Sequence, residues 1–267
     1  MAAHLAEAIR FPTVAHEAPE LFDAEAFAGL RDWMAETYPL THERLERELI
    51  GAGSLLYTWT GSDASLAPLV LMGHLDVVPV DPGTEGEWTH PPFAGVVSDG
   101  FVWGRGSLDD KVSVITILEA VEALLGEGFT PARTVYLAFG HDEEVGGLNG
   151  ARVVAETLDA RGMGRAALVV DEGGILSQGF MPGVEAPIAL VGVAEKGFVS
   201  LELKVRSEGG HSSMPPRETA ISILARAITR LEEQPFPTRL DGAARLMLDA
   251  VGPHMAFPVR VGLANLW

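Results

Sequence analysis

Short polar segments carrying Asp, Glu and His follow the apolar runs of this sequence. The first, Gly73-His74-Leu75-Asp76, comes directly after such a run. In an extended backbone, residues i and i+2 face the same way, so His74 and Asp76 are expected side by side. One arrangement places a metal ion on His74 while Asp76 orients the imidazole. The alternative is a plain turn after a strand, with Asp76 as a cap.

The second segment, GRGSLDDK at 104–111, precedes a predicted helix. Asp109 lies at a strand-to-helix junction, which is where α/β proteins place ligands. Asp109 and Asp110 are also explained as partners of the helix dipole. The glycines complete neither G-x-G-x-x-G nor a P-loop, so a phosphate site is weakly supported.

The third segment, His141-Asp142-Glu143-Glu144, follows another apolar run. Four titratable groups so close together repel one another unless a cation is present. Adjacent glutamates point to different sides, so one can bind metal while the other faces substrate as a base. A solvated run of surface charge is the alternative.

Two more segments complete the set. Asp171-Glu172-Gly173-Gly174 follows an apolar run, and His211 lies in the loop GGHSS at 209–213, where a solvated loop histidine is the plainer explanation. In an open α/β sheet, strand ends converge on one crevice. Several carboxylates in one crevice need one or two divalent ions to offset their charge. With no Cys in the chain, the ligands of a metal must be His, Asp, Glu or water.

The elements that position these segments alternate between strand and helix. Apolar runs predict strands at 54–59, 68–72, 134–139 and 166–170, and a hairpin at 96–103 that turns at Asp99-Gly100. Amphipathic spacing predicts helices at 22–38, 110–125 and 147–158. This alternation favours an α/β layered domain with a mainly parallel sheet.

The pattern changes near residue 190. Residues 198–205 alternate apolar and polar like a half-exposed strand, and 218–233 read as an amphipathic helix. We therefore expect a catalytic, metal-binding domain at 1–192 and the beginning of a smaller α+β domain at 193–267.

Composition limits the partners. The chain has 267 residues and 28.4 kDa, with 47% apolar and 21% charged residues, which is ordinary for a folded protein. Nineteen Lys and Arg against 37 Asp and Glu give a net charge of -18, which argues against nucleic acid and against an acidic membrane surface. Neither a membrane span nor a signal peptide is visible, so the default expectation is the cytoplasm.

In order and spacing, the motifs GHLDVVP, GRGSLDDK, GHDEEVGG, VDEGG and GGHSSMPP resemble those of the co-catalytic dizinc amidohydrolases and exopeptidases. This is the family of carboxypeptidase S, aminoacylase and succinyl-diaminopimelate desuccinylase. The loop WTHPPF at 88–93 and Glu195-Lys196-Gly197 look most like the carboxypeptidase S and N-acyl-amino-acid hydrolase branch. The resemblance implies a zinc-peptidase domain with a mixed central sheet flanked by helices, followed by the beginning of a ferredoxin-like lid domain.

The resemblance also implies a ligand set. His74 and Asp171 would bind one zinc ion, Glu144 would bind the second, and Asp109 would bridge both. The complete protein would hold two Zn²⁺ per subunit, with Co²⁺ or Mn²⁺ as substitutes. In the family, a further His comes from a segment beyond the lid. The late candidate His254 has the wrong context, so we expect the chain to be truncated at its C-terminus, with poor stability and little activity alone.

The remaining roles concern catalysis. By resemblance, Glu143 would be the general base, Asp76 would orient His74, and His211 of the lid would stabilise the oxyanion, in dimeric relatives across the subunit interface. The expected reaction is hydrolysis of a C-terminal peptide bond or of the acyl bond of an N-acyl amino acid, by a metal-bridging hydroxide. A homodimer through the lid is expected. The alternative is a non-catalytic, acidic metal-binding or interaction module.

Overall fold

The structure, a computed structural model, describes residues 1–179, 181, 183–195, 197–207, 209–211, 213–214 and 216–265. The chain divides into two units, Met1–Glu172 and Gly173–Trp267, and each is described by itself. Lys196, Ser212 and Pro215 of the motifs above lie outside the described residues. The boundary expected between residues 192 and 193 stays a prediction.

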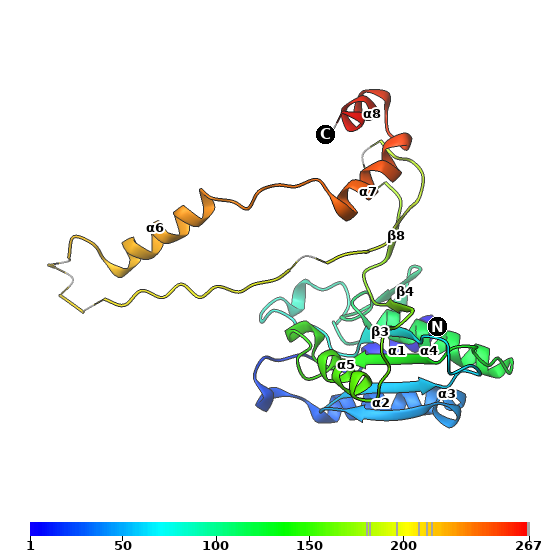
Figure 1. Cartoon of the computed structure of the whole chain (residues 1–267). Coiled ribbons are helices and arrows are strands. Elements are labelled where there is room, and N and C mark those ends of the chain that lie inside the picture. The colour runs from blue at the N-terminus through cyan, green and yellow to red at the C-terminus, as the bar shows by residue number, and fades with distance from the viewer. Residues whose placement is uncertain are drawn as a thin grey trace. The chain divides into compact units, whose positions relative to one another are not determined.

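A mixed five-stranded sheet forms the centre of the first unit (Figure 1). Its strand order is β1-β2-β6-β3-β7, with bounds Glu46–Ile50, Ser54–Trp59, Val135–Gly140, Leu69–His74 and Leu168–Val170. Strand β3 runs parallel to β6 and to β7, whereas β2 is antiparallel to β1 and β6. The mixed sheet implied by the family resemblance is therefore confirmed, whereas the mainly parallel sheet expected from the strand–helix alternation is wrong, because two of the four strand pairings are antiparallel. Strand β1 was not predicted, because its sequence ERELI is largely charged and lies mostly exposed at the sheet edge.

Helices cover both faces of this sheet (Figure 1). Side chains alternate along β6: Leu137 and Phe139 pack into the core shared with α1, α2 and α4, while Ala138 faces Val154 and Leu158 of α5. The helices of the first unit are α1 to α5, with bounds Ala2–Ile9, Ala24–Thr37, Pro39–Arg44, Lys111–Gly126 and Ala151–Ala160. The predicted helices at 22–38, 110–125 and 147–158 correspond to α2, α4 and α5.

The predicted hairpin is present as β4 (Val96–Ser98) and β5 (Phe101–Trp103), paired antiparallel. Asp99 and Gly100 both have positive φ, 54° and 83°. Two successive positive φ angles are the geometry that two-residue hairpin turns require. The Asp-Gly signal was therefore sufficient to locate this turn.

The described residues of the second unit form one short antiparallel strand pair and several helices. Strand β8 (Ile175–Ser177) pairs with β9 (Ile188–Leu190), and the helices are α6, α7 and α8, with bounds Ala220–Glu232, Gly242–Val251 and Phe257–Ala264. Helix α6 confirms the helix predicted at 218–233. The strand predicted at 198–205 is wrong, because no described segment pairs with it and isolated strands are not stable. The ferredoxin-like lid stays a prediction.

We also find no helix in the described part of the chain that combines the length and apolar character needed to cross a bilayer.

Candidate metal centre

The sheet brings polar side chains from three parallel strands to one edge. His74 ends β3, Glu143 follows β6, and Asp171 and Glu172 follow β7. Asp109 lies in the turn that precedes α4, and its peptide bond with Asp110 is cis. Because the carboxyl ends of parallel strands share an edge, side chains distant in sequence meet here.

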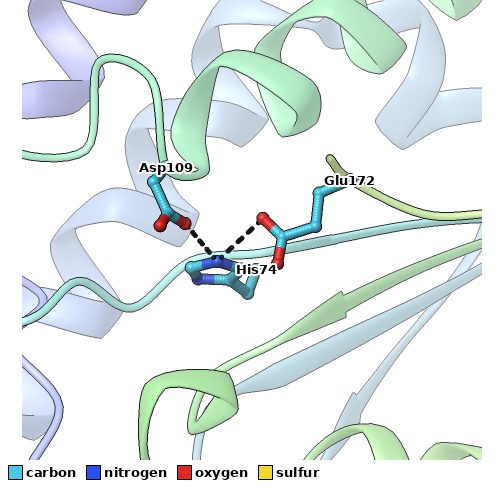
Figure 2. A group of neighbouring side chains, drawn as sticks. All are labelled: His74, Asp109 and Glu172. Carbon is cyan, nitrogen blue, oxygen red and sulfur yellow. Dashed lines mark hydrogen bonds and ion pairs between the residues drawn. The ribbon is translucent and has the colours of Figure 1, made fainter. Parts of the chain in front are cut away.

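His74 is the centre of the group, and its side chain is only 2% exposed. Its Nε2 lies 3.0 Å from Oδ1 of Asp109 and 3.3 Å from Oε2 of Glu172 (Figure 2). Oε2 of Glu143 is 3.8 Å from the same nitrogen. Over the described residues, ligand atoms of His74, Asp109 and Glu172 lie within 4.8 Å of one another, close enough to hold one metal ion.

Asp76 holds the opposite side of the imidazole. Its backbone carbonyl accepts a hydrogen bond from His74 Nδ1 at 3.0 Å, and its carboxylate Oδ1 lies 3.4 Å from Nδ1. The other carboxylate oxygen accepts the backbone N–H of Glu144 at 3.0 Å. With its proton on Nδ1, the ring directs the lone pair of Nε2 toward Asp109 and Glu172 once Nε2 is deprotonated. Asp76 therefore lies where an orienting residue is needed.

Asp110 connects the end of β3 to the beginning of α4. Its Oδ2 accepts the backbone N–H of His74 at 3.2 Å, although the residue occupies the N-cap position of α4 and makes no side-chain capping bond there. Gly73 permits this approach, since a Cβ at this position would lie 2.9 Å from Oδ2 of Asp110. The sequence pattern indicates only a helix-dipole partner at Asp110 and does not predict this bond.

The N-terminal segment, residues 8–13, forms hydrogen bonds with the loops that carry the centre. The fully buried Lys111 donates from Nζ to the carbonyls of Ala8 and Phe11, at 2.9 and 2.6 Å. Thr13 donates its hydroxyl to the carbonyl of Leu75 at 2.6 Å. The segment after α1 is therefore bonded both to the loop after His74 and to the start of α4.

The electrostatics of the group are those of crowded carboxylates around one imidazole. Burial lowers the pKa of His74, but Asp76, Glu172 and Asp110 outweigh it and raise the pKa to about 10. Burial raises the pKa of Glu172 to about 7; nearby carboxylates add to this rise and His74 opposes it. Burial also raises the pKa of Glu143, and nearby carboxylates raise it further. A divalent cation would stabilise the ionised form of each carboxylate.

The donor set suits a divalent metal. Imidazole nitrogen and carboxylate oxygen are the ligands that Zn²⁺ accepts in proteins without cysteine. Oδ1 of Asp76 is fully buried without a hydrogen-bond partner. That oxygen lies 3.4 Å from Nδ1 of His74, and a metal ion on Nε2 would keep the ring positively polarised after Nε2 loses its proton, so the oxygen would retain a favourable neighbour. The residues present therefore fit a metal ion at His74.

Other predicted residues are placed as follows. Burial and the charge of Asp109 raise the pKa of Glu144, so the carboxyl of Glu144 is affected by the charges of the centre. The charge of Asp171 contributes to the raised pKa of Glu143, but Glu172 is the residue of this pair that contacts His74. His211 is exposed in the second unit, and its Nδ1 lies 2.8 Å from Oγ of Ser213.

Glu172 is the ligand candidate that the sequence analysis missed. Its signal was its place in the acidic pair after β7. Neighbouring side chains in irregular backbone have no fixed direction, so the pattern could not decide between Asp171 and Glu172.

Comparison with known proteins gives a consistent result. The model of Peptidase family M20/M25/M40 matches residues 70–263. "Probable carboxypeptidase S-like 2" of Dictyostelium discoideum is 44% identical over 273 residues, which cover 100% of this chain and 51% of that protein. "N-fatty-acyl-amino acid synthase/hydrolase PM20D1" of Bos taurus is 42% identical, covering 97% of this chain and 51% of its own length. The chain thus spans about half the length of these curated relatives.

Solved structures show the same fold. An M20 family metallo-carboxypeptidase, Sso-CP2 from Sulfolobus solfataricus, aligns with a TM-score of 0.51 at 23% identity, over 65% of this chain and 37% of that one. Human carnosine dipeptidase 1 aligns with a TM-score of 0.52 at 21% identity, over 66% and 39%. At these identities the structures support the fold alone.

Proposed function

The chain belongs to Peptidase family M20/M25/M40, and on this premise we propose that it carries the metal-binding part of a zinc-dependent hydrolase of amide bonds. The family resemblance read from the sequence motifs is thereby confirmed. The bond cleaved is either a C-terminal peptide bond or the acyl bond of an N-acyl amino acid. The names of the two relatives above, a carboxypeptidase S-like protein and an N-fatty-acyl-amino acid hydrolase, support this pair of substrate classes.

The observation that carries the proposal is the meeting of His74, Asp109 and Glu172, with Glu143 beside them. A surface charge run does not enclose an imidazole that is 2% exposed. The alternative, a non-catalytic acidic metal-binding or interaction module, is not favoured, because the matching family is one of peptidases and the relatives above are named as a carboxypeptidase S-like protein and a hydrolase.

We propose two Zn²⁺ per subunit in the complete protein. His74 and an acid of the Asp171-Glu172 pair would hold the first ion, Glu144 the second, and Asp109 both. When bound, such ions polarise a carbonyl and lower the pKa of water toward about 7. Three carboxylates would offset three of the four positive charges and leave one in excess.

Glu143 is the proposed general base. Its carboxyl lies 3.8 Å from His74 Nε2, yet its side chain is 51% exposed, so it is open to water and substrate. Bound cations would keep this carboxylate ionised, which is the form that accepts a proton. It would take a proton from the attacking water and deliver it to the leaving amine. His211, the homodimer through the second unit, and the cytoplasm as location remain predictions.

A glutamine substitution tests the base. We expect Glu143→Gln to abolish hydrolysis of N-acyl amino acids and blocked dipeptides, in a version of the protein extended to the length of its relatives, while its zinc content stays unchanged. Glu156→Gln, on the exposed face of α5, is the matched control and should retain full activity. Substantial turnover in Glu143→Gln would remove Glu143 from this role.

The ligand set is tested by metal analysis after exhaustive dialysis. His74→Ala and Asp109→Ala should each lower the bound zinc. Between Asp171→Asn and Glu172→Gln, the variant that loses zinc identifies the ligand from this acidic pair. Unchanged zinc stoichiometry in all four variants would contradict the metal centre itself.

A further inference from the structure

A cavity of about 510 Å³ lies in the first unit, outside the group around His74. Its volume falls within the roughly 300–1,000 Å³ of small-molecule sites. Its walls include Trp88, His90, Val102 and Trp103, together with the hydroxyl-bearing residues Thr84, Thr89 and Ser107. Among the described residues that line it, Glu87 is the one acid and none is Lys or Arg. The chemistry of the walls therefore suits an uncharged group more than an anion.

The aromatic walls are held in place by contacts of their own. Trp103 donates its indole N–H to the carbonyl of Ser98 at 3.2 Å. The His90 ring meets Trp103 edge to face, with centroids 5.3 Å apart, and its Nε2 lies 3.4 Å from the Ser98 hydroxyl. The guanidinium of Arg105 lies 5.2 Å from the centroid of the Trp88 ring. The polar atoms of Trp103 and His90 already have partners, so these two rings are held in place and can offer apolar contact.

One lining segment is connected to the loops of the metal centre. Ser107 lines the cavity and stands two residues before Asp109. The backbone N–H of Lys111 donates to the carbonyl of Gly106 at 3.1 Å. A Cβ at Gly106 would lie 2.8 Å from Val77, the residue after Asp76. The loop that contributes Ser107 to the cavity is thus packed against the segment after Asp76 and leads directly to Asp109.

We propose that this cavity receives an uncharged aliphatic or aromatic group of the amide substrate. The inference rests on the proposed function, since it takes the scissile amide to lie at the metal centre. The group can belong to the acyl side or to the amine side of the amide. In either case Glu87 would repel a carboxylate at the same position.

Calorimetric titration distinguishes these sources. The probes are N-hexanoyl-glycine (apolar on the acyl side), N-acetyl-phenylalanine (apolar on the amine side), N-succinyl-glycine (charged) and N-acetyl-glycine (reference). Trp103→Ala should weaken binding of one apolar probe by about tenfold, through lost apolar contact, and leave N-acetyl-glycine unchanged. The probe that is weakened identifies the side. Val97→Ala, exposed on the same hairpin and outside the cavity lining, is the matched control.

Folding and hydrolysis are separated from binding in this design. Thermal unfolding checks each variant, and Trp88→Ala provides a second alteration of the wall if Trp103→Ala does not fold. The titrations are made with EDTA and again with Zn²⁺, so they do not depend on turnover. In the version extended to the length of its relatives, apolar preference without any hydrolysis in zinc would leave the cavity assigned and refute the proposed function. Equal affinities of all four probes, or equal losses in Trp103→Ala and Val97→Ala, would overturn the assignment of the cavity.

Discussion

Zinc affinity at His74 is expected to rise steeply with pH, because the metal must displace protons from its ligands. In the metal-free site the pKa of His74 is about 10 and that of Glu172 about 7. At pH 6 both groups are mainly protonated, whereas at pH 8 His74 alone is. Binding should therefore release about two protons at pH 6 and about one at pH 8.

The size of the effect follows from these two pKa values. From pH 6 to pH 8 the pH stays below the pKa of His74. The deprotonated fraction of His74 therefore rises about a hundredfold, and the zinc affinity rises by the same factor. The pH passes through the pKa of Glu172 in this range, so the ionised fraction of Glu172 rises and increases the zinc affinity about tenfold. The zinc affinity should thus increase by a factor on the order of 10³ over these two pH units.

Calorimetry in two buffers with different ionisation enthalpies counts the protons released at each pH. A competing chelator measures the affinity. His74→Ala, which removes the group with the highest pKa, should flatten most of the dependence. An affinity that does not change between pH 6 and pH 8 in the parent protein would show that these groups do not bind the metal.

Three further predictions concern the support of the site and the core. Asp76→Asn should lower zinc affinity by about 10–100-fold, since it removes the carboxylate behind the imidazole; chelator competition measures this, and an unchanged affinity speaks against an orienting role. Lys111→Met should lower the free energy of unfolding by about 1–3 kcal/mol in urea titrations, because two backbone carbonyls lose their donor; an unshifted midpoint would contradict this. Leu137→Ala, at a fully buried position, should lower the free energy of unfolding by about 2–5 kcal/mol in the same urea titrations. The exposed Leu49→Ala, in the same sheet, should change stability by less than about 0.5 kcal/mol, and equal losses would refute the placement of the core.

Much of the first unit could be predicted from local patterns. Apolar runs located β2, β3, β6 and β7, and the Asp-Gly dipeptide located the hairpin, because each signal is confined to a few neighbouring residues. The direction of β2 and the existence of the charged edge strand β1 were not visible. Both depend on which strands become neighbours, and single-segment patterns carry no such information.

For the site, the sequence by itself determined that the polar segments with His74, Glu143 and Asp171-Glu172 follow strands and that Asp109 precedes a helix, and therefore that acids and a histidine distant in sequence would gather at one edge of the sheet. Only the tertiary structure decided that Glu172 contacts His74 while Asp171 does not, and that Asp110 bonds the backbone of β3 instead of capping α4. The physical reason is that residue types and spacing specify the side chains at a sheet edge. The direction of each side chain depends on the irregular backbone after the strand and on the neighbours packed against it.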